Sequence, residues 1–267
     1  MPSDAKLNQR AWEEAYAHKN DYEKDLTKHI ESKSLYYLAE PLKEVLQNLN
    51  ISSESHIMQF CSNNGRELLD VCHTLSCRGT GFDLAQNMVE AANQYAATLG
   101  VSATFHAGDL LEQDFSRYAA ADFVMMTVGS LCWFQSLDAL FAKVSEALKE
   151  EGQFIVHDSH PFTYSTLAAS SESNYDARYP ERLVNDYGRT EPWVEGGGMG
   201  YMSTLEDSAV FVSYSHTMAA ILNALSRNKL ILESFSESPI DYAGVFEELT
   251  TVKLPYSMLF VARKRKL

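Results

Sequence analysis

Strands and helices alternate over about a hundred residues from His56, and this alternation constrains the fold more than any other feature of the sequence. Short apolar runs typical of buried strands occur at 56–61, 78–83, 101–109, 120–128 and 153–159. Amphipathic helical segments separate them. Such alternation predicts parallel strands joined by crossover helices on both faces, that is, a doubly wound α/β sheet. Ligands of such sheets bind at the carboxyl ends of the strands.

Two other regions depart from this alternation. Residues 1–50 read as helices and predict an N-terminal helical cap on a sheet domain at 51–267, with Pro41 starting or kinking one helix. From about 160 to 207 the sequence is rich in Tyr, Ser, Gly and Pro and is too long for a plain connection. We expect an ordered insertion after the fifth strand, over the carboxyl edge of the sheet. Further strand patterns follow it.

The net charge of the chain limits the kinds of molecule that it is expected to bind. The chain of 267 residues has 22 basic and 36 acidic residues, a balance of −14 that would repel a nucleic acid backbone. A neutral or cationic small molecule is the expected partner. No apolar run approaches the ~18 residues of a membrane span, and the polar N-terminus does not resemble a signal peptide, so we expect a cytoplasmic protein with reduced cysteines. The oligomeric state stays open.

Polar residues and glycines recur where the predicted strands end. Gly65, after the first strand, permits close backbone approach and opens a helix whose N–H groups face a ligand. Asp83 ends the second strand and can accept the hydroxyls of a ribose or cap the next helix. Asp109 can accept from an adenine amino group while Leu110 packs on the ring, or form a simple turn. Gly129 follows the fourth strand.

The segment "HDSHP" follows the fifth strand. His157 and Asp158 are neighbours in a strand, so their side chains should point to opposite faces of the sheet. The segment offers too few ligands for a metal site, and we expect none. His160 is the candidate general base. The sequence has no Gly-x-Gly-x-x-Gly, which disfavours a nicotinamide oxidoreductase.

Taken in order, these segments resemble the class I S-adenosylmethionine-dependent methyltransferases, from about residue 55 to the C-terminus. "IMQFCSNNGRE" is similar to their first motif, "GFDLAQNMVEAAN" to the ribose motif and "FHAGDL" to the adenine-side motif. "FVMMTVGSLCWF", "VSEALKEEGQFIVHDSHP" and "LPYSMLFVARK" resemble later strand regions. The resemblance implies a seven-stranded, mostly parallel sheet of order 3-2-1-4-5-7-6 with strand seven antiparallel, and S-adenosylmethionine as cofactor. The cofactor-binding residues it implies are Phe60, Cys61, Asn63, Gly65, Asp83, Leu84, Met88, Gly108, Asp109, Leu110, Thr127, Val128 and Gly129.

The first motif departs from the usual Asp-x-Gly-x-Gly-x-Gly. Gln59 stands at the acidic position, and Cys61 and Asn63 stand at the first two glycines. Asn63 tolerates a left-handed backbone, so "CSNNG" can hold the turn. Gln59 keeps an acceptor oxygen but lacks the charge that usually holds the methionine amino group. The chain resembles a branch of the family with Gln-Cys in this loop and a Gly-x-Leu-Cys-Trp segment after strand four. How the methionine end is held is therefore the open question.

The expected activity is in-line methyl transfer to an unidentified small-molecule acceptor, since alignment supplies most of the catalysis. The alternative is a non-catalytic binding module of the same fold, suggested by Gln59 and Cys61. Aromatic residues of the N-terminal helix either close over the cofactor or pack on the domain, and those after strand four either cover it or pack the next helix. The substrate-side candidates are Trp12, Tyr16, Tyr22, Trp133, Tyr164, Tyr187, Trp193 and Tyr201.

Overall fold

A seven-stranded sheet forms the centre of the computed structural model, which describes residues 2–246, 249 and 254–266. The strand order is β10-β11-β5-β4-β1-β2-β3. Six strands run in the same direction and β11 runs opposite to them, since it pairs antiparallel with both β5 and β10. The predicted order 3-2-1-4-5-7-6 is confirmed, with β10 as strand six and β11 as strand seven. The strands are β1 (His56–Phe60), β2 (Arg78–Asp83), β3 (Ala103–Ala107), β4 (Ala121–Met126), β5 (Leu148–Ser159), β10 (Leu230–Ser238) and β11 (Ser257–Lys264).

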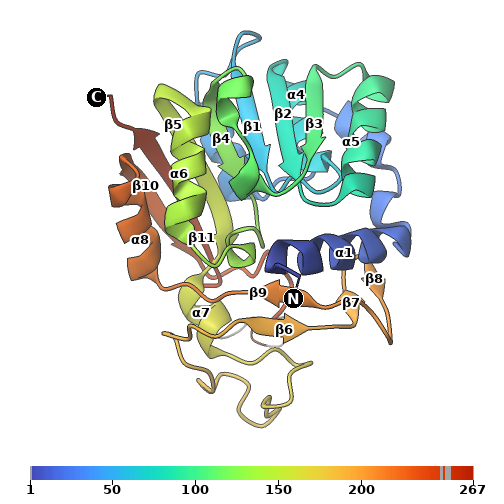
Figure 1. The fold of residues 1–267 in the computed structure, drawn as a ribbon, viewed down its shortest axis with the longest axis vertical. Coiled ribbons are helices and arrows are strands. Elements are labelled where there is room, and N and C mark those ends of the chain that lie inside the picture. Colours follow the sequence, from blue (N-terminus) through green and yellow to red (C-terminus); the bar gives the residue numbers. More distant parts are fainter. Residues whose placement is uncertain (1, 247–248, 250–253, 267) are drawn as a thin grey trace.

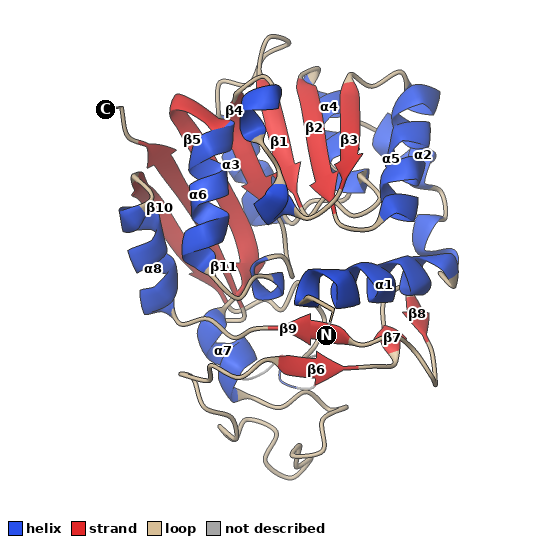
Figure 2. Cartoon of the chain, in the orientation of Figure 1, coloured by secondary structure: helices blue, strands red, loops and turns tan. Residues whose placement is uncertain are grey.

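Helices cover both faces of this sheet (Figure 2). On one face, α3 (Glu40–Asn48), α4 (Arg66–Leu75) and α5 (Gln86–Leu99) contribute to a core with Ile57 and Met125. On the other, α6 (Leu137–Ala147) and α8 (Met218–Arg227) enclose Met58 and Val124. The side chains of neighbouring strand residues thus go to opposite cores, as strand geometry requires. The full burial of β1 explains its continuous apolar run.

Helix α6 is shorter than the sequence pattern predicts. The helical pattern extends to Gly152, but α6 ends at Ala147 and β5 begins at Leu148. Glu151 has a φ of 64°, and a Cβ at position 152 would lie 2.9 Å from the backbone oxygen of Lys149. The charged stretch "KEEG" therefore belongs to the beginning of β5. Pairing with neighbouring strands outweighs its local helix propensity.

The N-terminal helices pack in two different places. The first, α1 (Asp4–Ala17), lies below the carboxyl edge of the sheet in Figure 1. After the short turn η1 (Asp21–Glu23), α2 (Leu26–Glu31) and α3 pack into the core beside α4. Pro41 lies in the first turn of α3, so it starts that helix and does not kink it. The proposed boundary at residue 50 stays a prediction.

The insertion contains its own small elements. They are α7 (Pro161–Thr166), β6 (Trp193–Glu195), β7 (Gly198–Met199), β8 (Ser203–Thr204) and β9 (Phe211–Ser213). Strand β9 pairs with β6 and not with the main sheet. Helix α1 joins this layer through Asn8, whose amide both donates to and accepts from the backbone of Val212, at 2.8 and 2.7 Å. Within the described part of the chain, no helix has the length and hydropathy to cross a membrane.

Candidate functional site

A cavity of about 1320 Å³ lies where β1, β2, β4 and β5 end, facing α1 and the insertion. Its volume exceeds the roughly 300–1,000 Å³ of common ligand pockets, so it can hold two small molecules side by side. Ten of the predicted cofactor residues line it. They are Cys61, Asn63, Asp83, Leu84, Gly108, Asp109, Leu110, Thr127, Val128 and Gly129. The other three do not: Phe60 and Met88 are core residues, and Gly65 lies beneath the loop.

The loop after β1 has a left-handed backbone at every second residue. The φ angles are 57° at Cys61, 52° at Asn63 and 79° at Gly65, the three positions aligned with the family glycines. The Asn63 side chain supports the turn, since its Oδ1 accepts from the backbone N–H of Asn64 at 2.7 Å and from the Tyr22 hydroxyl at 3.1 Å. Gly65 has no room for a side chain, because a Cβ would lie 2.7 Å from the Phe105 ring. The glycine-rich turn therefore forms with one glycine.

Asp83 fastens this loop from the end of β2. Its carboxylate accepts from the backbone N–H of Asn63 at 2.6 Å and of Ala85 at 3.0 Å. It does not cap α5, whose N-cap residue is Ala85. Burial raises the pKa of Asp83, and the backbone hydrogen bonds oppose that shift. A carboxylate has about four acceptor positions, so Asp83 keeps capacity for a ligand hydroxyl.

Asp109 adopts the turn that its sequence allows. Its Oδ1 accepts from the backbone N–H of Leu111 at 2.9 Å and caps a short 3-10 turn, Leu110–Glu112. Leu110 belongs mainly to the core. Both residues nevertheless line the cavity. Their adenine contacts stay a prediction.

A second carboxylate fastens the loop after β4, a role that the sequence did not predict for it. Asp158, on β5, accepts from the backbone N–H groups of Gly129, Ser130 and Leu131 at 2.6, 3.2 and 2.8 Å. Burial raises its pKa, and these backbone donors oppose the shift. The carboxylate sets the position of the Gly129 turn, and so the wall of the cavity.

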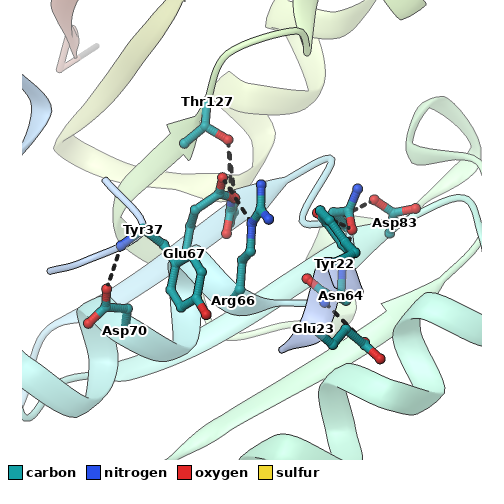
Figure 3. Close-up of polar contacts among 11 residues, drawn as sticks. Tyr22, Glu23, Tyr37, Asn64, Arg66, Glu67, Asp70, Asp83 and Thr127 are labelled. Carbon is teal, nitrogen blue, oxygen red and sulfur yellow. Dashed lines mark hydrogen bonds and ion pairs between the residues drawn. The ribbon is translucent and has the colours of Figure 1, made fainter. Parts of the chain in front are cut away.

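Three polar side chains meet on the α4 face, where β1 and β4 end, and Figure 3 labels two of them, Glu67 and Thr127. Gln59 is wholly buried, and its Nε2 donates to Glu67 Oε2 at 3.0 Å and to Thr127 Oγ1 at 3.3 Å. The Thr127 hydroxyl lies 3.4 Å from the same Glu67 oxygen. The Gln59 Oε1 is buried without a partner among the described residues. Sequence reasoning missed Glu67, although its place two residues after Gly65 puts it at the start of α4.

Arg66, also missed, lies beside Glu67 on the cavity wall (Figure 3). Its guanidinium stacks 4.4 Å from the Tyr22 ring centre and 5.4 Å from that of Tyr37. Its Nε is 4.0 Å from Glu67 Oε1. Burial opposes its charge, but Tyr22 and Glu67 outweigh that effect and raise the pKa. No described residue gives the guanidinium a closer acceptor.

Known proteins share a domain and a fold with this chain. Residues 57–152 match the family model of a methyltransferase domain. No curated protein matches the sequence significantly. Solved structures share the fold, among them an S-adenosylmethionine-dependent methyltransferase from Listeria monocytogenes described as putative, with 17% identity, a TM-score of 0.64 and coverage of 84% of this chain and 96% of that one.

The geranyl diphosphate C-methyltransferase of Streptomyces coelicolor, solved with Mg²⁺, geranyl-S-thiolodiphosphate and S-adenosyl-L-homocysteine, has 12% identity, a TM-score of 0.61 and 98% coverage of both chains. The [4+2]-cyclase SpnF has 13% identity, a TM-score of 0.54 and coverage of 84% of this chain and 80% of its own. Residues 57–152 thus match a methyltransferase domain, and the chain shares the fold of S-adenosylmethionine-dependent methyltransferases. At these identities, the structural likeness by itself concerns the fold.

Six of the eight substrate-side candidates line the cavity: Trp12, Tyr22, Trp133, Tyr164, Trp193 and Tyr201. Tyr16 does not, because it is buried and its hydroxyl donates to Glu23. Tyr187 lies elsewhere and accepts from the backbone N–H of Met218 at 2.7 Å. Both were predicted from aromatic character alone, which does not fix the direction of a side chain.

The structure also gives His160 another place. Its Nδ1 accepts from the Phe162 N–H at 3.2 Å and caps α7, while its Nε2 is 2.9 Å from Glu237. His160 does not line the cavity, so its position does not favour a general base. His157 does line it, and burial lowers the pKa of His157 to about 4. His157 is therefore neutral at physiological pH.

Proposed function

We propose that this protein transfers a methyl group from S-adenosylmethionine to a small-molecule acceptor in the switch-point cavity. The observation that carries the proposal is the β1 loop, in which three left-handed residues and the Asp83 clamp build a glycine-type cofactor turn. The size of the cavity supports it, since a second ligand fits beside the cofactor. Asp83 would accept the ribose hydroxyls, and Asp109 and Leu110 would flank the adenine.

The sulfonium end of the cofactor would lie at Thr127–Gly129. The cofactor supplies the electrophilic methyl group, and the residues of the chain bind, orient and exclude water. Alignment of the reactants can contribute about 7–11 kcal/mol to the barrier reduction. The Asp158 clamp keeps the Gly129 turn fixed for this purpose. Trp12 and Trp133 line the same cavity, and an aromatic ring can stabilise a cation.

Cavity charge favours a neutral or cationic acceptor. Arg66 is the one Lys or Arg among the described residues around the cavity. The acidic residues there are Asp4, Glu40, Glu67, Asp83, Asp109, Asp158, Glu172 and Glu195. The described residues also contain no cluster of three or more His, Cys, Asp or Glu suited to a metal. A diphosphate acceptor like that of the Streptomyces enzyme would lack countercharge here.

Calorimetry with S-adenosylmethionine and S-adenosylhomocysteine tests the cofactor assignment. We expect both to bind, and Asp83→Asn to weaken S-adenosylhomocysteine by about 10-fold or more, since hydrogen bonds to a charged acceptor are lost. Asp138→Asn is the matched control, because Asp138 lies on the exposed end of α6 and pairs with Arg227. No binding to the unaltered protein would refute the proposal.

The alternative is a binding module that holds the cofactor without transferring its methyl group. The cyclase SpnF shows that proteins of this fold are not confined to one reaction. Incubation with methyl-labelled cofactor and a panel of small amines, phenols and acids separates the two. Labelled product supports the enzyme, whereas tight cofactor binding with no transfer to any acceptor in the panel favours the module.

A further inference from the structure

We propose that Arg66 and Glu67 form a receptor for the amino acid end of the cofactor, in which Glu67 supplies the negative charge that Gln59 lacks. This inference rests on the proposed cofactor. It names the residues that hold the methionine ammonium and carboxylate in a chain whose first strand has no acidic residue at the expected position.

The position of Glu67 is the first argument. The Glu67 carboxylate accepts a hydrogen bond of 3.0 Å from the Gln59 amide. It therefore lies close to the place that the carboxylate of an acidic residue at position 59 would occupy. Gln59 and Thr127 provide only neutral partners, and Glu67 lines the cavity. The Glu67 side chain is only 16% exposed, and its nearest cation, Arg66 Nε, is 4.0 Å from Oε1, so the carboxylate has room for a closer charged partner. The ammonium of an amino acid would be that partner.

The unpaired Gln59 oxygen is the second and independent argument. Gln59 is completely buried, and its Oε1 has no partner among the described residues. Buried polar atoms are nearly always hydrogen-bonded in native proteins. An ammonium has three N–H donors. Gln59 does not itself line the cavity, but its amide lies 3.0 Å from Glu67, and we infer that one ammonium beside Glu67 donates to both the carboxylate and the free Gln59 oxygen.

Arg66 completes the receptor. Its guanidinium is fixed by the rings of Tyr22 and Tyr37, yet its nearest acid, Glu67, is 4.0 Å away and reaches only Nε. The planar fork of a guanidinium is suited to a carboxylate, which it binds through two parallel hydrogen bonds. The two adjacent residues thus offer opposite charges to the two charged groups of one amino acid, and both line the cavity (Figure 3).

Two probes separate the amino acid end from the rest of the cofactor. S-adenosylhomocysteine contains it, whereas 5′-methylthioadenosine has the adenosine and sulfur without it. We expect Glu67→Gln to weaken S-adenosylhomocysteine binding about 10- to 100-fold, as for a lost charged hydrogen bond, and to leave methylthioadenosine binding unchanged. Arg66→Gln should show the same selectivity. Glu90→Gln, at an exposed site on α5, is the control.

A charge swap tests the relation to Gln59 directly. In the double variant Gln59→Glu with Glu67→Gln, the carboxylate moves to β1 and the two side chains keep their hydrogen-bonding complement. We expect it to regain most of the S-adenosylhomocysteine affinity that Glu67→Gln loses. Circular dichroism and thermal unfolding show whether each variant is folded.

Equal weakening of both probes by Glu67→Gln would overturn the inference, because it would mean a role in loop structure. Unchanged S-adenosylhomocysteine affinity would overturn it as well. If methylthioadenosine binds to the unaltered protein and S-adenosylhomocysteine binds no better, the adenosine site stands and the receptor does not. If neither probe binds, the proposed function itself fails and the receptor fails with it.

Discussion

Two loops face the cavity from neighbouring strands, and each is held by an aspartate on the next strand outward. The loop after β1 is held by Asp83 on β2, and the loop after β4 by Asp158 on β5. They differ in how completely the carboxylate is used. Asp83 accepts from two backbone N–H groups, Asn63 and Ala85. Asp158 accepts from three in the β4 loop as well as from the N–H of Ser159.

The number of acceptor positions in use distinguishes an aspartate with a structural role from one that can also bind a ligand. Asp158 is 3% exposed and its oxygens are occupied, so it serves to fix the backbone. Both aspartates line the cavity, but Asp83 is partly exposed and has acceptor positions left over. The same residue type, in the same place relative to a parallel strand, thus acts as a backbone clamp in one loop and as clamp plus ligand acceptor in the other.

The largest effect should come from Asp158→Ala. It leaves several buried backbone N–H groups without an acceptor, and we expect a loss of about 3–5 kcal/mol in the free energy of unfolding. Asp83→Ala is the matched variant and should lose only about 1–2 kcal/mol, since two donors are released. Urea denaturation followed by fluorescence measures both. Equal losses would remove the distinction between the two clamps.

A change of pH should distinguish the contribution of Asp83 to stability from its contribution to cofactor binding. Burial raises its pKa in the folded protein, so its contribution to the stability of the free protein is complete below the unfolded-state pKa and is lost as pH rises through the folded pKa. Ligand hydroxyls require the ionised form, so cofactor affinity should change in the opposite sense and fall as pH drops through that pKa. The raised pKa places this loss above the ordinary Asp range.

Calorimetric titration with S-adenosylhomocysteine from pH 7 downward measures this fall. Asp83→Asn, which cannot titrate there, should show a flatter profile. An identical profile in the two proteins would assign the pH dependence to another group.

The smallest effect should come from Asn63→Gly. Its φ of 52° suits glycine, so the turn remains possible, while the two hydrogen bonds to Oδ1 are lost. We expect a change within about 1 kcal/mol in unfolding free energy. Asn63→Val should cost more, because a β-branched residue is strained at positive φ. Thermal unfolding compares the pair, and a Val variant as stable as the Gly variant would contradict the left-handed turn.

The alternation of apolar segments predicted a doubly wound parallel sheet, because hydrophobic period follows from local chemistry, and the family resemblance implied the strand order and the antiparallel strand. Strand order, the antiparallel last strand and the turn at Asn63 are confirmed. The errors of the sequence predictions lie where tertiary packing decides. The residues "KEEG" have helix propensity but join β5. Tyr16 and Tyr187 turn away from the cavity, and His160 caps α7.

What the sequence determined by itself was therefore the frame: a doubly wound sheet, a first loop able to turn with one glycine, and an aspartate at the end of β2. Only the tertiary structure placed Glu67 against Gln59 and Thr127, and Asp158 beneath the β4 loop. These contacts join residues that lie on different strands, helices and loops. Their distances depend on register and on the packing of α4, which no local pattern encodes.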